Sequence, residues 1–214
     1  MAAGDITAAM LLDLGRRLED TDSGGNKFPD AVRYDGLNYA QLRMVGLLHP
    51  SYLTEFENVS SAVDISAGNV TLATIDSGGI INGGNGVIAC KVTPGSGTAQ
   101  WATKTSIDGL RTIQQSGHFA ESDTNPYFYI LTNKVYFLIS TYTAAVADIY
   151  YHDYPTDIAS GVDPVLNTAL HPVLLDFAEA YCWSTDSEHG EVAARRAVPE
   201  AKAIEQIKIL NGKV

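Results

Sequence analysis

The chain is poor in charge and in long apolar runs, and each shortage excludes a class of protein. Charged residues make up 18% of its 214 residues, below the roughly one quarter of an average soluble domain. No apolar run approaches the roughly 20 residues of a membrane span. No basic start precedes an apolar segment, so we expect no secretory signal. Hydrophobic residues still reach 45%, enough for a large core. We expect a soluble, folded protein without a membrane partner, built as one medium domain or as a core with a sizeable insertion.

Basic residues and cysteines are scarce as well. Lys and Arg number 14 against 25 Asp and Glu, which gives a net charge of −11. No segment gathers basic side chains into a patch that neutralises phosphates, so tight binding to DNA is not expected. The two cysteines, Cys90 and Cys182, fall in different predicted elements. This favours buried thiols in a reducing compartment.

Apolar spacing predicts that the first segment, residues 1–57, is helical. Asp5 is suited to cap a first helix, because apolar residues follow it with a period near 3.6. A second helix is predicted over about 37–48. It ends at His49-Pro50, because the residue before a proline disfavours the α conformation.

The last segment, residues 165–214, is predicted to return to helix. Asp163-Pro164 has the form of a cap followed by a first-turn proline, and apolar residues then recur at three and four positions. Pro172 predicts a kink or a restart in this helix. A final helix is expected over about 187–210, with Pro199 kinking or dividing it.

The middle segment, residues 58–164, is predicted to be a β-rich domain, because glycine clusters separate short β-type runs. Thr132-Asn133 is suited to a hairpin turn, and alternation predicts a buried face made of Ile88, Cys90 and Val92. The predicted strands cover 70–75, 87–93, 127–131, 135–139 and 145–151.

Both terminal segments carry one-sided apolar stripes that need a packing partner. We therefore predict an α+β fold. Residues 1–57 and 165–214 pack together as a helical layer, and residues 58–164 form a central, mainly antiparallel β domain.

The motifs that could carry chemistry are weak. The glycines of 78–91 lack the Lys-Ser/Thr and the following helix of a phosphate loop, so a hairpin turn is favoured there. His152-Asp153 and the acidic cluster at 186–191 lack a second His or Cys at ligand spacing. We therefore expect no metal, no cofactor and no enzyme activity. The tyrosines of the predicted strands are explained by packing in the β core and by subunit contacts, and the other interpretation is a sugar-binding platform.

Several short stretches follow one another in a distinctive order of helix, β segment and helix. They are Leu11-Leu12-Asp13-Leu14, Leu18-Glu19-Asp20, Tyr34-Asp35-Gly36-Leu37-Asn38-Tyr39-Ala40-Gln41, Pro126-Tyr127-Phe128-Tyr129-Ile130, Asn133-Lys134-Val135-Tyr136-Phe137, Ile149-Tyr150-Tyr151, Tyr154-Pro155 and Leu170-His171-Pro172-Val173-Leu174-Leu175-Asp176-Phe177-Ala178-Glu179-Ala180. In these stretches and their order the chain resembles the head-to-tail connector, or adaptor, proteins of tailed bacteriophages. The resemblance covers most of the chain except about 58–105.

The resemblance implies a virion structural protein of the neck or tail, made in the host cytoplasm. It implies a ring of twelve copies below the portal protein, through which DNA passes, with downstream tail or nozzle proteins as further partners. The C-terminal segment would then reach toward the portal. The alternative class is a carbohydrate-binding or tail-tip adhesin module, and an acidic hydrolase is a more distant third.

The candidate partner-binding residues form a stripe on the last predicted helix. Two interpretations remain open for this stripe. It packs on the protein's own first helix, or it docks on the portal or on a neighbouring subunit. The four residues are Ala203, Ile204, Ile207 and Leu210.

Overall fold

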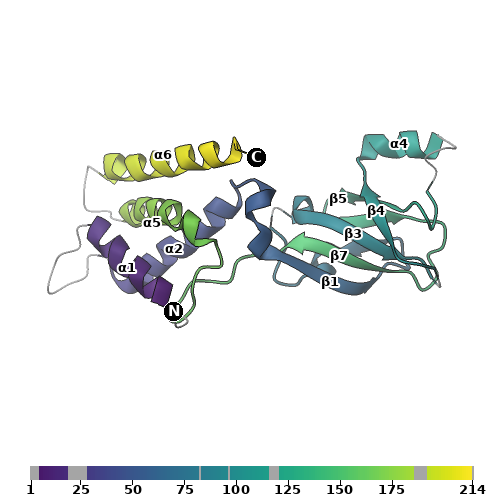
Figure 1. The fold of residues 1–214 in the computed structure, drawn as a ribbon, viewed down its shortest axis with the longest axis horizontal. Helices are drawn as coiled ribbons and strands as arrows, with labels where there is room; N and C mark the ends of the chain where they lie inside the picture. Colours follow the sequence, from purple (N-terminus) through teal and green to yellow (C-terminus); the bar gives the residue numbers. More distant parts are fainter. Residues whose placement is uncertain are drawn as a thin grey trace. The chain divides into compact units, whose positions relative to one another are not determined.

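The chain folds into two compact units. The computed structural model describes residues 5–18, 28–81, 83–95, 97–115, 121–185 and 192–213. A helical unit takes in the chain up to Glu55 and again from Pro155 onward, and a β unit spans Phe56–Tyr154 (Figure 1). The β unit is thus an insertion in the helical unit. This confirms the α+β fold with its terminal helices and central β domain.

The second boundary between the units falls earlier than predicted. Residues 155–164 were expected in the β domain but belong to the helical unit. Side chains of α2 hold this stretch. Asn38 exchanges two hydrogen bonds with the backbone of Ile158, at 2.7 and 3.1 Å. Gln41, which is buried, donates to the carbonyl of Thr156 at 3.0 Å.

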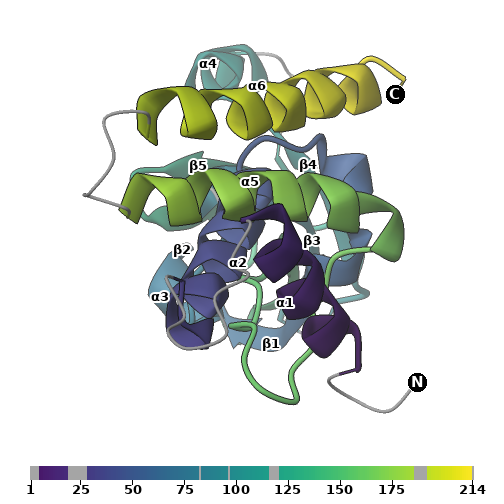
Figure 2. The same ribbon diagram turned by 90° about the vertical axis from the view of Figure 1, so that its left-hand side faces the viewer.

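In the described residues of the helical unit there are four α-helices, and α5 contacts each of the others, α1, α2 and α6. Figure 2 shows α5 and α6 side by side along their lengths. Because neighbours surround it, α5 is apolar on nearly every side, as a fully buried helix must be. The elements are α1 (Asp5–Arg17), α2 (Asp30–Val45), α5 (His171–Thr185) and α6 (Val192–Asn211), with short 3-10 turns η1 (Pro50–Tyr52), η2 (Thr54–Phe56) and η4 (Thr168–Leu170).

Helix α2 begins earlier than predicted, at Asp30 instead of 37. Gly36, just outside the predicted range, lies inside the helix. A Cβ at Gly36 would come within 3.1 Å of the carbonyl oxygen of Ala178 and of the Cys182 sulfur. The glycine therefore lets α2 approach α5 closely, which is a packing role and not a helix end.

The proline-based predictions for the C-terminal helices have different outcomes. The restart at Pro172 is confirmed, because η4 ends at Leu170 and α5 starts at His171, which places Pro172 in the first turn, where a missing N–H costs nothing. Asp163 caps a different helix, because its carboxylate accepts from the backbone N–H of Thr7 in α1 at 2.9 Å. Pro199 lies inside a continuous α6. The predicted start of α6 near 187 lies outside the described residues.

The β unit holds a seven-stranded sheet in the order β1-β7-β3-β4-β5-β6-β2. Every described strand pair is antiparallel except β4–β5. One face of the sheet carries the apolar core, which includes Phe128, Phe137 and Ile149. The elements are β1 (Glu57–Asp64), β2 (Asn69–Thr71), α3 (Leu72–Ile75), η3 (Gly83–Gly86), β3 (Val87–Thr93), β4 (Gln100–Lys104), α4 (Ile107–Gln115), β5 (Tyr127–Leu131), β6 (Lys134–Leu138) and β7 (Val146–His152).

The hairpin prediction is confirmed, and the buried face of β3 is partly corrected. Leu131 pairs with Lys134 around Thr132, whose φ of 58° suits a tight turn. In β3 the pairing with β7 shifts register between Val87 and Ala89. This bulge turns Ile88 outward, so that Val87 is buried in its place. The strand predicted over 70–75 ends at Thr71, which caps α3.

The glycine-rich segment is not a hairpin turn. It forms η3, and the bridge just before it joins Ile80 to Asp153. A Cβ at Gly86 would overlap the carbonyl oxygen of Ile81, and one at Gly84 would overlap the side chain of Ile130. The glycines are therefore needed because the backbone here packs against its neighbours without room for a side chain.

Candidate partner-binding site

The C-terminal stripe divides into two buried and two partly exposed residues. Ala203 is fully buried and Ile207 is 3% exposed. Helix α6 packs on α5, so these two residues belong to the core of the helical unit. This corrects the assignment of Ala203 and Ile207 as partner-binding residues. It also shows that they pack on α5 and not, as the alternative interpretation had it, on the first helix. Ile204 and Leu210 are only partly buried.

Leu210 lines a groove of about 310 Å³ at the end of α6. Two short turns make the other walls. His49 caps η1 by accepting from the N–H of Ser51, and Asn167 caps η4 by accepting from the N–H of Ala169 at 3.0 Å. The full lining is Ser51, Tyr52, Thr54, Glu55, Asn167, Ala169, Leu170 and Leu210. The groove therefore mixes an apolar floor with hydroxyl, amide and carboxylate groups.

The last turn of α6 is held in place beside this groove. The Tyr52 hydroxyl donates to the carbonyl of Leu210 at 3.2 Å. The side chain of Asn211 accepts from the N–H of His49 at 2.8 Å and donates to the carbonyl of Leu47 at 2.9 Å. These bonds satisfy groups that a helix end would otherwise leave open. Leu210 is thus fixed in position with part of its side chain uncovered.

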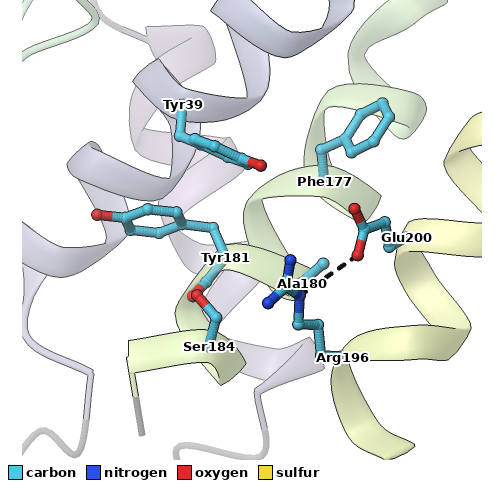
Figure 3. Close-up of a pocket in the computed structure, with 7 residues that line it drawn as sticks. All are labelled: Tyr39, Phe177, Ala180, Tyr181, Ser184, Arg196 and Glu200. Carbon is cyan, nitrogen blue, oxygen red and sulfur yellow. Dashed lines mark hydrogen bonds and ion pairs between the residues drawn. The ribbon is translucent and has the colours of Figure 1, made fainter. Parts of the chain in front are cut away.

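A second, smaller pocket of about 140 Å³ lies among α2, α5 and α6 (Figure 3). Tyr39 and Tyr181 pack with their ring centres 4.9 Å apart. Glu200 forms ion pairs with Arg196 at 3.3 Å and with Arg43 at 3.6 Å. Phe177, Ala180 and Ser184 complete the lining. The pocket has room for about one side chain of a partner.

The strongest electrostatic feature of the helical unit joins three helices. Asp176 of α5 is 1% exposed, and one of its oxygens accepts from Arg17 of α1 at 2.6 Å and from Lys202 of α6 at 3.0 Å. Its other oxygen has no hydrogen-bond partner within the described parts of the chain. Burial also raises the pKa of neighbouring Glu179, although Arg17 and Lys202 oppose the shift. The role of this cluster is to hold α1, α5 and α6 together.

Of the residues considered for metal binding, the structure describes His152 and Asp153. His152 is buried, which lowers its pKa, with Glu57 opposing that shift. Its neighbour Asp153 accepts from the amide of Asn58 at 3.1 Å. The acidic cluster at 186–191 lies outside the described residues. Where the structure describes the chain, no three His, Cys, Asp or Glu side chains are placed to hold a metal ion.

Both cysteines are buried free thiols. Burial raises the pKa of Cys182 to about 12 and raises that of Cys90 further, so neither carries the thiolate of a nucleophile near neutral pH. No helix among the described residues is long and apolar enough to span a membrane.

Sequence reasoning missed most of the groove. His49-Pro50 was interpreted only as the end of a helix, and nothing in the sequence shows that the turns capped by His49 and Asn167 meet at Leu210. No protein-family model matches the chain, and no curated protein matches it. The resemblance to connectors therefore rests on the stretches quoted from the sequence.

Proposed function

We propose that the protein is a subunit of a head-to-tail connector in the virion of a tailed bacteriophage. It forms a homo-oligomeric ring, a dodecamer by the resemblance, below the portal protein and above downstream tail or nozzle proteins. DNA passes through the ring without being gripped. The role is structural, with no chemical step and no cofactor.

The groove at Leu210 is the observation that carries this proposal. It lies at the end of α6, the segment that the resemblance directs toward the portal. An apolar side chain held rigidly at the edge of a groove is the usual form of an interface anchor. Burying the exposed part of Leu210 contributes on the order of 1 kcal/mol per subunit, and a closed ring repeats each contact at every copy.

The overall charge supports the same function. A net charge of −11 repels phosphates, and a wall that repels DNA lets it slide through a channel. The union of both chain ends in one helical unit also agrees with the segment order on which the resemblance rests.

The test uses purified full-length protein, alone and with the portal protein of the same phage. Negative-stain images should show rings, and the two proteins should comigrate on size exclusion. Leu210→Asp should abolish comigration while leaving the thermal melt unchanged. Ile209→Asp is the matched control, because Ile209 is 54% exposed on the same turn and does not line the groove.

The proposal fails if the wild-type protein neither forms rings nor binds the portal. It also fails if the two variants behave alike. Truncation of α6 is unsuitable as a test, because it would remove the buried Ala203 and Ile207 and unfold the helical unit.

A further inference from the structure

The face of the sheet opposite the core carries an aromatic pair that spans three strands. Strands β7, β3 and β4 are neighbours in the sheet (Figure 1). Tyr150 of β7 lies opposite Ala89 of β3, and Trp101 of β4 lies opposite Lys91 of β3. The Trp101 and Tyr150 rings meet with centres 5.3 Å apart and planes inclined at 39°. The small Ala89 side chain leaves room for the two rings to meet over the middle strand.

Trp101 is exposed to an extent unusual for tryptophan, while Tyr150 is partly buried. Trp101 is 60% exposed, whereas Trp183 in the helical unit is 5% exposed. Exposed tryptophan forgoes the hydrophobic gain of burial, and a contiguous apolar patch points to an interaction site where a single apolar residue would not. Val59 of β1, which lies opposite Tyr150, is also 42% exposed and extends the surface by one strand.

Polar groups border the two rings. The Lys91 ammonium lies 5.9 Å from the centre of the Trp101 ring and makes no ion pair with residues that the structure describes. Asp148, opposite Lys91 in β7, accepts from the backbone N–H of Ala62 at 2.9 Å. The surface therefore combines exposed aromatic rings with charged and hydrogen-bonding groups at its border.

The size of the surface decides what it can bind. A whole tryptophan or tyrosine side chain presents about 150–250 Å², so the exposed part of this pair and Val59 amounts to roughly 200–300 Å². A stable protein interface needs about 800 Å² from each partner. These three side chains therefore supply well under half of one partner's share of a protein interface, and their area matches one or two sugar rings.

We propose that Trp101 and Tyr150 form a binding platform for a neutral carbohydrate chain. The C–H faces of the sugar rings lie against the two aromatic rings, and the Lys91 ammonium donates a hydrogen bond to a sugar hydroxyl. A neutral polymer is specified because the net charge of −11 repels anionic ones. This site is independent of the groove at Leu210 and of the proposed connector role.

The test titrates full-length protein with a fixed panel of neutral hexasaccharides. The panel contains the hexamers of β-1,4-glucose, α-1,4-glucose, β-1,4-mannose, β-1,4-xylose and β-1,4-N-acetylglucosamine. Tryptophan fluorescence reports binding at Trp101, because Trp183 is buried in the other unit. At least one hexamer should bind with a Kd of about 1 mM or tighter. Trp101→Ala should weaken that binding at least about tenfold, as measured by calorimetry.

Two further variants separate the platform from a general effect on folding. Trp101→Phe keeps an aromatic ring and should retain part of the affinity. Ile107→Ala, an exposed apolar site of α4 in the same unit, should bind like the wild type. The proposal is wrong if no hexamer binds at about 5 mM, if Trp101→Ala binds as well as the wild type, or if Trp101→Ala instead disperses a self-association of the protein.

Discussion

Replacing Asp176 with Asn removes the negative charge that Arg17 and Lys202 share. The shape of the side chain is kept, so the change tests the charge and not the packing. Two charge-assisted hydrogen bonds, at 2.6 and 3.0 Å, are weakened at once. Because these bonds connect α1 and α6 to the central α5, we expect the helical unit to lose stability and the β unit to keep its own.

The exposure of Arg17 and Lys202 determines how much stability Asp176→Asn should remove. Removing one partner of a fully buried ion pair costs about 3–5 kcal/mol, because the remaining charge stays buried. Here the Arg17 side chain is 26% exposed and that of Lys202 is 57% exposed, so both can turn partly to water. Asparagine also lacks the desolvation penalty of the buried carboxylate. We therefore expect a loss of about 2 kcal/mol in the free energy of unfolding.

Each unit holds one of the two tryptophans, which makes the measurement selective. In a Trp101→Phe background, the fluorescence of Trp183 follows urea unfolding of the helical unit alone. Asp13→Asn is the matched control, since Asp13 contacts the same guanidinium at 3.3 Å but is 46% exposed, and its loss should cost less than about 0.5 kcal/mol. If Asp176→Asn costs no more than Asp13→Asn, the cluster does not join the three helices energetically.

Other consequences of the structure can be tested separately. Glu179→Gln should raise the melting temperature at pH 7 but not at pH 4. The pKa of Glu179 is raised in the folded protein, so its ionisation above about pH 4.5 destabilises the fold, and glutamine removes that cost. Equal changes in melting temperature at pH 4 and pH 7 would contradict this. Gly86→Ala should destabilise the β unit by about 3 kcal/mol or more through overlap with Ile81. Gly83→Ala is the control, because φ there is +57° and nothing lies within 4 Å of an added Cβ, so it should cost only about 1 kcal/mol. If urea unfolding shows the same loss for both variants, the overlap between the added Cβ and Ile81 is not the cause of the destabilisation at residue 86. Native Cys182 should resist iodoacetamide at pH 8, because its pKa is raised to about 12, and mass spectrometry that finds it modified without denaturant would argue against its burial. Micromolar protein should not retard duplex DNA on a gel at physiological salt, and a shifted band would contradict the acidic-channel idea.

Periodic apolar residues and turn residues made the class of fold predictable. The +3 and +4 spacing of apolar residues in α5 and the turn at Thr132 can be predicted because each depends only on residues close together in the sequence. The predictions that failed depended on contacts between distant residues. Asp163 has the form of a helix cap, but the helix that it caps begins more than 150 residues earlier in the chain, at Asp5.

The same limit applies to the candidate sites. The packing role of Gly36 depends on Ala178, which lies more than 140 residues later in the chain. The stripe on α6 was visible, but its division into buried Ala203 and half-exposed Leu210 depends on where α5 and the two capped turns lie. Trp101 gave no sequence signal at all, because its pairing with Tyr150 requires the order of the strands.

The insertion of the β unit sets the order in which the protein can be completed during synthesis. Helices α1 and α2 leave the ribosome first, but their main packing partner, α5, follows only after the whole of Phe56–Tyr154. At roughly 5–20 residues per second, translating about 100 intervening residues takes on the order of 5–20 s. During that interval Leu37 and Met44, which the finished protein buries completely, have no α5 to cover them. The nascent N-terminal helices are thus a binding target for chaperones, while the β unit, whose strands pair only with one another, can fold as soon as it emerges.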